Sequence, residues 1–178
     1  MNREQLEHVL RAAVDIVPGE DMLIIGSQAV LATQDESRLP IAAIRSIEVD
    51  LAFFDDDQEA KADAIDGAIG ELSRFHETFG YYGQGVSIAT AVLPSGWEDR
   101  LVLLGAAGAS NRIRALEAHD CVASKLVADR PKDREFAEAL LEGRIVDPRT
   151  LAARIELLPE SVPSSRRAAI RANIDRWS

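Results

Sequence analysis

Glu48 and Asp50 are the side chains in this sequence best suited to chemistry, because they lie two positions apart within an apolar run. Side chains alternate between the two faces of a strand, so residues at positions i and i+2 project from the same side. Their carboxylate oxygens can therefore share one divalent cation. The same alternation places Ser46 beside them and gives the core face to Ile47, Val49, Leu51 and Phe53. The alternative is that both acids lie on the solvent-facing side of an edge strand.

A glycine-serine turn, Gly26-Ser27, follows the apolar run 22–25. Such a turn can present backbone N–H groups and a hydroxyl to a phosphate at the start of a helix. The alternative uses the same geometry, since glycine permits a tight turn and serine is a good helix cap. A phosphate site also needs a cation to neutralise the remaining oxygens. The acids of the following strand would bind one, so the two signals together favour phosphoryl-type transfer, which depends mainly on positioning and electrostatics.

Basic residues that could contact phosphate lie in a later, helical part of the sequence. Lys125 falls on an expected helix, with Asp129 at i+4 as an ordinary surface ion-pair partner. A short basic segment with Arg130, Lys132 and Arg134 follows. These side chains either lie in solvent at the start of a helix or contact a triphosphate or an RNA backbone.

Composition limits the classes of function. The chain has 178 residues, 47% of them hydrophobic, and a formal net charge of -10, which predicts one compact unit that as a whole repels nucleic acid. No apolar run approaches a membrane span and the first residues are charged, so we expect a cytoplasmic protein without membrane contact. The tail 161–178 is locally basic, with four arginines against one aspartate for a net of +3. It could contact RNA, an acidic partner or the acidic body of the same protein.

The order of expected elements indicates an α+β fold: a small mixed β-sheet flanked by helices, with a C-terminal helical region. We expect a core over residues 1–117 and a helical region over 118–178 that completes a cleft. The expected strands are 22–25, 44–54, 86–93, 100–104 and 112–116, the third and fourth forming a hairpin. The expected helices are 3–16, 28–33, 58–79, 118–129, 132–142, 148–157 and 164–177.

Four successive motifs of the chain resemble those of the nucleotidyltransferase superfamily, in particular its abortive-infection branch, the toxins of type IV toxin-antitoxin systems. The resemblance spans roughly residues 20 to 145. The motifs are Gly26-Ser27, Arg45-Ser46-x-Glu48-x-Asp50, Asp120-x-x-x-Ser124-Lys125-Leu126 and Arg130-x-Lys132-Asp133.

The resemblance implies a magnesium-dependent transfer of a nucleoside monophosphate from a nucleoside triphosphate to a hydroxyl of RNA, such as a tRNA-like acceptor, or of protein. It implies Mg²⁺ on Glu48 and Asp50, and a catalytic surface formed by these two acids with Lys125 and Asp133. An antitoxin protein would be a further partner. The residues implied to bind the nucleotide are Gly26, Ser27, Ser46, Lys125, Arg130 and Lys132.

Two departures from the family pattern support other functions. The family usually has aspartate at the position of Glu48, and the segment 86–92 contains no third acid of the kind that many members carry on a later strand. One alternative is a catalytically degenerate protein that binds a nucleotide or a partner. Another is a plain interaction module, such as the antitoxin-like partner of a separate toxin.

Overall fold

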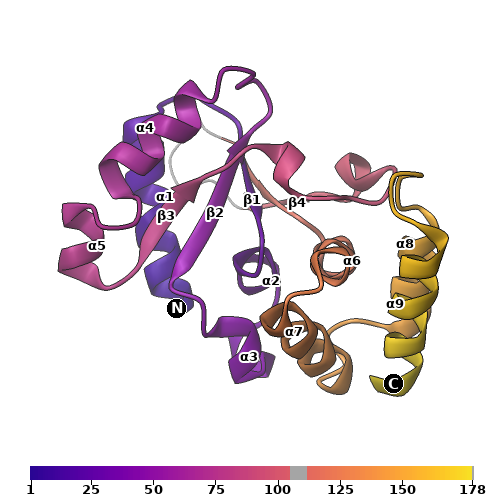
Figure 1. Ribbon diagram of the computed structural model, residues 1–178. Helices are drawn as coiled ribbons and strands as arrows, with labels where there is room; N and C mark the ends of the chain where they lie inside the picture. Colours follow the sequence, from indigo (N-terminus) through magenta and orange to yellow (C-terminus); the bar gives the residue numbers. More distant parts are fainter. Residues whose placement is uncertain (105–111, 178) are drawn as a thin grey trace.

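Figure 1 shows the computed structural model of the protein, which describes residues 1–104 and 112–177. Within these residues the sheet has five strands in the order β3-β2-β1-β5-β4. Two neighbouring pairs, β1·β5 and β2·β3, are parallel, whereas β1·β2 and β4·β5 are antiparallel. The strands are β1 (Met22–Ile25), β2 (Glu48–Phe53), β3 (Tyr82–Gly85), β4 (Val102–Leu103) and β5 (Ile113–Ala115).

Helices flank this mixed sheet and form most of the second half of the chain, which confirms the expected α+β class. In the first half they are α1 (Arg3–Ile16), α2 (Gln28–Thr33), α3 (Ile41–Ile44), α4 (Ala60–Ile69) and α5 (Arg74–Phe79). In the second half they are α6 (Ala118–Ala128), α7 (Pro131–Glu142), α8 (Pro148–Glu156) and α9 (Ser164–Trp177). None of the helices described is long and apolar enough to cross a membrane.

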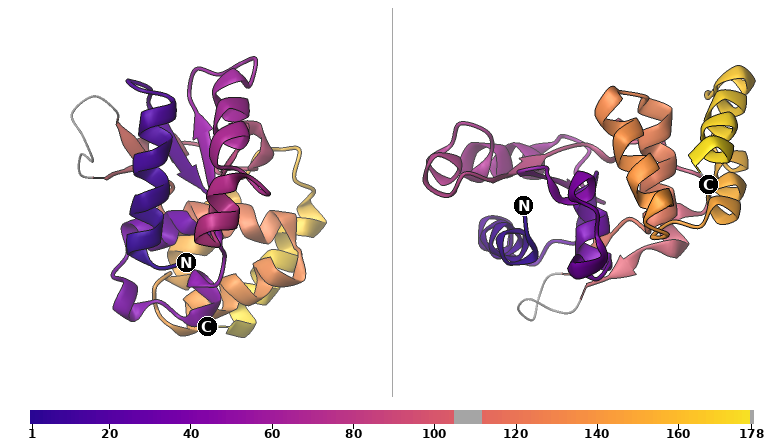
Figure 2. Two further views of the ribbon diagram at one scale, coloured as in Figure 1. Left: turned by 90° about the vertical axis from the view of Figure 1, so that its left-hand side faces the viewer. Right: turned by 90° about the horizontal axis from the view of Figure 1, so that it is seen from below.

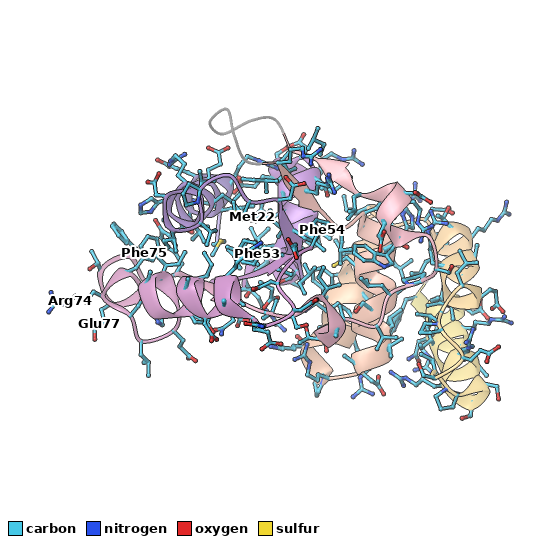
Figure 3. The ribbon with its side chains drawn as sticks, turned by 90° about the horizontal axis from the view of Figure 1, so that it is seen from above. Met22, Phe53, Phe54, Arg74, Phe75 and Glu77 are labelled. Carbon is cyan, nitrogen blue, oxygen red and sulfur yellow. The ribbon has the colours of Figure 1, made fainter. Side chains whose placement is uncertain are left out.

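Helices α1 and α4 cover one face of the sheet. A Cβ atom on Gly83 of β3 would lie 3.0 Å from Val9 of α1 and 2.9 Å from Ile69 of α4, so the missing side chain lets both helices approach. Figure 3 shows Met22 and Phe53 in the layer between these helices, and both are buried. The acids of β2 alternate with the residues of this face and therefore project from the opposite one, toward α6 and α7.

The C-terminal helices pack against one another on the side of the sheet away from α1 and α4 (Figure 2). Asp120 of α6 is fully buried and joins this region to the segment before β4. Its Oδ2 lies 2.7 Å from Arg100 Nε, and its Oδ1 lies 3.2 Å from Nε of Arg154 on α8. Because a buried carboxylate needs such compensation, Asp120 links α6 to α8 and to the segment before β4.

Three predicted elements and one predicted strand pairing differ from the structure. The strand expected at 44–54 begins only at Glu48, since residues 41–44 form α3. The helix expected at 58–79 is two helices, because Gly70 ends α4 and the Ser73 side chain caps α5. The strand expected at 86–93 is wrong: β3 lies just before it, and residues 88–90 form a 3₁₀ turn. The expected hairpin is also wrong, because β4 pairs with β5.

Most arginines of the basic tail contact the protein itself. Arg166 pairs with Asp129 at 2.6 Å, and Arg171 pairs with Glu156. Arg167 donates hydrogen bonds to backbone carbonyls around the end of α8, including those of Leu158 and Pro159. Of the three alternatives for this tail, the structure therefore favours contact with the protein's own body.

Candidate active site

Glu48 and Asp50 lie side by side on β2, and their charges repel. Burial is the largest cause that raises the pKa of Asp50 to about 7, followed by its hydrogen bond with Glu48 and the negative charge of that residue. The charges of Lys125 and Lys132 act in the opposite direction. The Tyr82 hydroxyl of β3 donates a 3.2 Å hydrogen bond to Glu48 Oε2 and fixes the second carboxylate. The pair is therefore held in place while its negative charge is incompletely neutralised.

The backbone of Gly26 lies directly against the Asp50 carboxylate. Its φ of +71° is a conformation that side chains disfavour, and a Cβ atom there would run directly into the Asp50 carboxylate. The Cys121 thiol donates a 3.0 Å hydrogen bond to the Gly26 carbonyl from the buried side of α6, which agrees with a core cysteine. Ser27 makes no side-chain cap bond to α2, so its hydroxyl is left for the cavity that it lines.

Asp133 organises the basic residues opposite the carboxylate pair. The residue is only 1% exposed, and its Oδ2 lies 2.6 Å from Arg130 Nε while its Oδ1 lies 3.5 Å from Lys125 Nζ. Burial alone would raise the pKa of Asp133, but the hydrogen bond and charge of Arg130, with the charge of Lys125, outweigh burial and lower the pKa. The buried Asp133 carboxylate therefore positions the two cations Arg130 and Lys125.

A first cavity of about 440 Å³ brings most of the predicted residues together. It contains both acids of β2 and four cations, and it therefore offers a phosphate group several positive partners opposite a carboxylate pair. Of the predicted residues, Gly26 alone is outside this lining and belongs to the neighbouring cavity. The lining is Ser27, Ala42, Arg45, Ser46, Ile47, Glu48, Asp50, Lys125, Arg130, Lys132, Asp133 and Phe136.

The lining also includes residues for which sequence patterns gave a different role or none. Ile47 was expected on the core face of a strand, but it precedes β2 and is 46% exposed at the cavity. Phe136 was not predicted, and its ring lies 6.0 Å from Lys125 Nζ. Its helical spacing after Lys132 and Asp133 is the one signal that could have placed it on the same face of α7.

A second cavity of about 400 Å³ adjoins the first and shares Asp50, Lys125 and Arg130 with it. Its other described lining residues carry no charge. Aliphatic walls come from the segment after β3 and from the end of α6, with Thr90 and Ser124 contributing hydroxyls. Sequence patterns did not predict this cavity, because they assigned the segment 86–93 to a strand.

The strand position beside Asp50 is occupied by Gln84. The parallel register pairs these two residues, so their side chains leave the sheet on the same face. The Gln84 amide donates a 2.8 Å hydrogen bond to Asp66 Oδ2, and Asp66 Oδ1 accepts a bond from the Gly85 N–H. Among the described residues, no group of three or more acidic, histidine or cysteine side chains could hold a metal.

A divalent cation with few protein ligands fits this chemistry. Mg²⁺ keeps several waters and is commonly bound by one or two carboxylates together with substrate phosphates. Glu48 and Asp50 supply two such carboxylates, and burial, followed by the hydrogen bond and the charge of Glu48, raises the pKa of Asp50. A cation placed between them would relieve the repulsion between their charges.

The protein has an α+β fold, and a glycine-serine turn lies against a carboxylate pair that faces several cationic side chains across one cavity. This combination is typical of a nucleotidyltransferase-like protein. Comparison with protein families agrees: the family described as nucleotidyltransferase of unknown function (DUF6036) matches residues 4–158, and the chain belongs to it. Searches of curated proteins and of solved structures gave no match.

Proposed function

We propose that the protein is a magnesium-dependent nucleotidyltransferase that moves a nucleoside monophosphate from a nucleoside triphosphate to a hydroxyl. The observation that carries this proposal is the first cavity, in which Glu48 and Asp50 face a wall of cations ordered by Asp133. Membership in a nucleotidyltransferase family supports the same reaction class.

The triphosphate would lie in the first cavity. Its β- and γ-phosphates would meet Lys132, Arg130 and Arg45, and the hydroxyls of Ser27 and Ser46 would donate hydrogen bonds to its oxygens. Lys125 lies at the junction of the two cavities and would stabilise the charge that develops on the leaving group. Asp133 would act through Arg130 and Lys125 as a positioning residue.

The reaction would be an in-line displacement at the α-phosphorus. A hydroxyl oxygen of the acceptor would form the new bond to phosphorus and lose its proton to solvent water, the bridging bond to the β-phosphate would break, and pyrophosphate would leave. Glu48 and Asp50 would hold the Mg²⁺, which neutralises phosphate charge when bound. The remaining contribution of the protein is to orient the triphosphate.

The division of labour follows the two halves of the chain. Residues 1–117 would form the core that supplies the acids and the glycine-serine turn, and residues 118–178 would complete the cleft with Lys125, Arg130 and Lys132. A role as the toxin of a cytoplasmic toxin-antitoxin pair, with RNA or protein as acceptor and an antitoxin as partner, rests on the sequence resemblance.

One observation favours a second candidate. Gln84, which pairs with Asp50 in the register of β2 and β3, carries no charge and is tied to Asp66 by a hydrogen bond. Together with the two departures from the family pattern, Glu48 and the absence of an acid in 86–92, this supports a protein that binds a nucleotide without transferring it.

The test is incubation of the protein with Mg²⁺, each α-labelled nucleoside triphosphate in turn, total RNA and cell protein, beside an Asp50→Ala control. Label in an acceptor with the unmutated protein alone would establish the transferase. Binding of a nucleotide in calorimetry without any label transfer would instead support the degenerate binding protein.

A further inference from the structure

Two cavities meet at Asp50 and differ in how many charged groups line them. The three shared residues, Asp50, Lys125 and Arg130, separate them. Beyond these, the first cavity adds two cations, Arg45 and Lys132, and two acids, Glu48 and Asp133, whereas the described residues that line only the second are all uncharged. With Mg²⁺ on Glu48 and Asp50, as the proposed function requires, Arg45 and Lys132 favour a polyanionic group in the first cavity, whereas the second adds only uncharged partners to the shared residues.

The in-line geometry of the reaction indicates which cavity holds the leaving group and which holds the acceptor. In phosphoryl-type transfer the attacking and leaving oxygens lie roughly opposite each other across the phosphorus. The pyrophosphate carries the larger charge and belongs with the cations of the first cavity. With the α-phosphorus close to Asp50, the attacking oxygen must approach from the side of the second cavity.

The walls of the second cavity restrict the molecule that carries this oxygen. Val86, Val92, Leu116 and Val127 provide an aliphatic lining, and Thr90 and Ser124 provide neutral hydrogen-bonding groups. The volume of about 400 Å³ lies within the range of small-molecule sites, which extends from about 300 to 1,000 Å³. An uncharged body the size of a phenol ring fits there, whereas an RNA terminus would place phosphates against aliphatic side chains.

We propose that the second cavity is the acceptor site and that the acceptor is a neutral hydroxyl on an apolar body, such as the phenol of a tyrosine side chain or of a free molecule. This inference rests on the proposed transferase function. The acceptor oxygen bonds to the α-phosphorus, its proton is released to solvent water, and the bond to the β-phosphate breaks to release pyrophosphate.

The rest of the surface supports a neutral acceptor. RNA would need a local basic patch on a chain with a net charge of -10. The basic tail is one candidate for such a patch, but Arg166 and Arg171 pair with Asp129 and Glu156, and Arg167 binds backbone carbonyls. These three side chains are already occupied by the protein.

Two matched substitutions test the assignment. Ala128 is exposed and lines only the second cavity, and Ala42 is partly exposed and lines only the first. The probes are N-acetyltyrosinamide, a heptapeptide with one tyrosine and otherwise uncharged side chains, and an RNA oligonucleotide with a free 3'-hydroxyl, each with an α-labelled nucleoside triphosphate and Mg²⁺. Ala128→Trp should raise the KM for the phenol about tenfold or more and leave the KM for the triphosphate unchanged, and Ala42→Trp should do the reverse.

Label on either phenol probe with this crossed pattern supports the proposal. A lower KM for the heptapeptide assigns a protein source, and equal values assign a free molecule. Label on the RNA alone, or an Ala128→Trp variant that changes only the KM for the triphosphate, overturns it.

A binding measurement separates this proposal from failure of the transferase function. In amide NMR spectra, N-acetyltyrosinamide should shift Val92 and Ala128, and a magnesium-bound triphosphate should shift Ala42 and Ser46. If no label is transferred but these shifts appear, the transferase function fails and the cavity assignment stands. If the phenol shifts none of the second-cavity residues, the assignment fails whatever the activity.

Discussion

The Asp50 carboxylate occupies the space where a side chain on Gly26 would begin. A Cβ atom on Gly26 would clash with Asp50 Oδ2. The two atoms would be far closer than 3.0 Å, a separation below which Cβ contacts essentially do not occur in proteins. Gly26 directly follows β1, and Asp50 lies on the neighbouring strand β2, where it pairs with Ile25 in the antiparallel register. The turn that follows β1 and the acid on β2 therefore form one unit.

Replacement of Gly26 by alanine should abolish the site. Alanine adds both the cost of a positive φ and a clash with Asp50, so we expect a loss of about 3 kcal/mol in the free energy of unfolding and loss of label transfer. Gly19→Ala is the matched control, because Gly19 has a φ of +83° but no atom within 4 Å of the added Cβ. Urea denaturation should show a loss of only about 1 kcal/mol for the control. Equal losses in the two variants would mean that the Gly26–Asp50 contact is unimportant.

The raised pKa of Asp50 predicts a pH dependence of stability in the absence of metal. The folded protein holds the proton of Asp50 up to a pH of about 7, whereas the unfolded chain releases it near the ordinary aspartate pKa of 3.8. The free energy of unfolding should therefore fall as the pH rises from about 4 to about 7. Asp50→Asn should weaken this dependence and raise stability at pH 8.

The measurement is a series of urea midpoints between pH 4 and pH 8 in EDTA for both proteins. The same variant should lose label transfer by about 100-fold or more, because it lacks one charge of the carboxylate pair. Parallel pH profiles of the two proteins would contradict this account of Asp50.

The buried Asp133 should matter for both stability and nucleotide affinity. Asp133→Asn removes the charge that holds Arg130 and Lys125, so we expect a loss of about 2 kcal/mol at pH 7 and a rise of about tenfold in the KM for the triphosphate. Since the folded pKa is lowered, the stabilisation exists above the unfolded pKa and disappears as the pH falls below about 4.

Glu135→Gln is the control on the same helix for the stability measurement. The Glu135 side chain is 56% exposed and pairs with Arg45 at the surface, so its loss should change the free energy of unfolding by less than about 1 kcal/mol. An Asp133→Asn variant with normal stability and normal KM would show that Asp133 has no role in the site.

Asp120 should be important for stability and unimportant for nucleotide binding. Asp120→Ala leaves the guanidinium groups of Arg100 and Arg154 without their shared carboxylate, at a cost of about 3 kcal/mol or more. Thermal denaturation measures that loss, with Asp175→Ala at an exposed position of α9 as the control. At a temperature where the variant is folded, its KM for the triphosphate should be normal; a large change in KM would assign Asp120 to the nucleotide site.

Local sequence patterns were sufficient for much of this fold. The helical periodicity of residues 3–16 matches α1, and the strand expected at 22–25 matches β1. The acids of β2 and the cations of α6 and α7 were also predicted as parts of one site, and they line a common cavity. Their roles stay predictions until an activity is measured.

Other features depend on packing and could not be predicted locally. Residues 86–93 contain the β-branched pattern of a strand, yet the strand beside β2 is the glycine-containing Tyr82–Gly85. Gly83 is suited to that place because its lack of a side chain admits Val9 and Ile69. The second cavity follows from this shift, since it is formed where the displaced segment meets α6.

Arg167 makes the last helix, α9, part of the folded unit. The family match ends at residue 158, yet Arg167 of α9 binds the carbonyls of Ile155, Glu156 and Leu158, and Ile170 and Ile174 are buried. The sequence shared with the family is therefore shorter than the unit that folds. A protein cut at the family boundary would expose apolar surface and uncapped carbonyls, and inactivity of such a fragment would report on its folding and not on its chemistry.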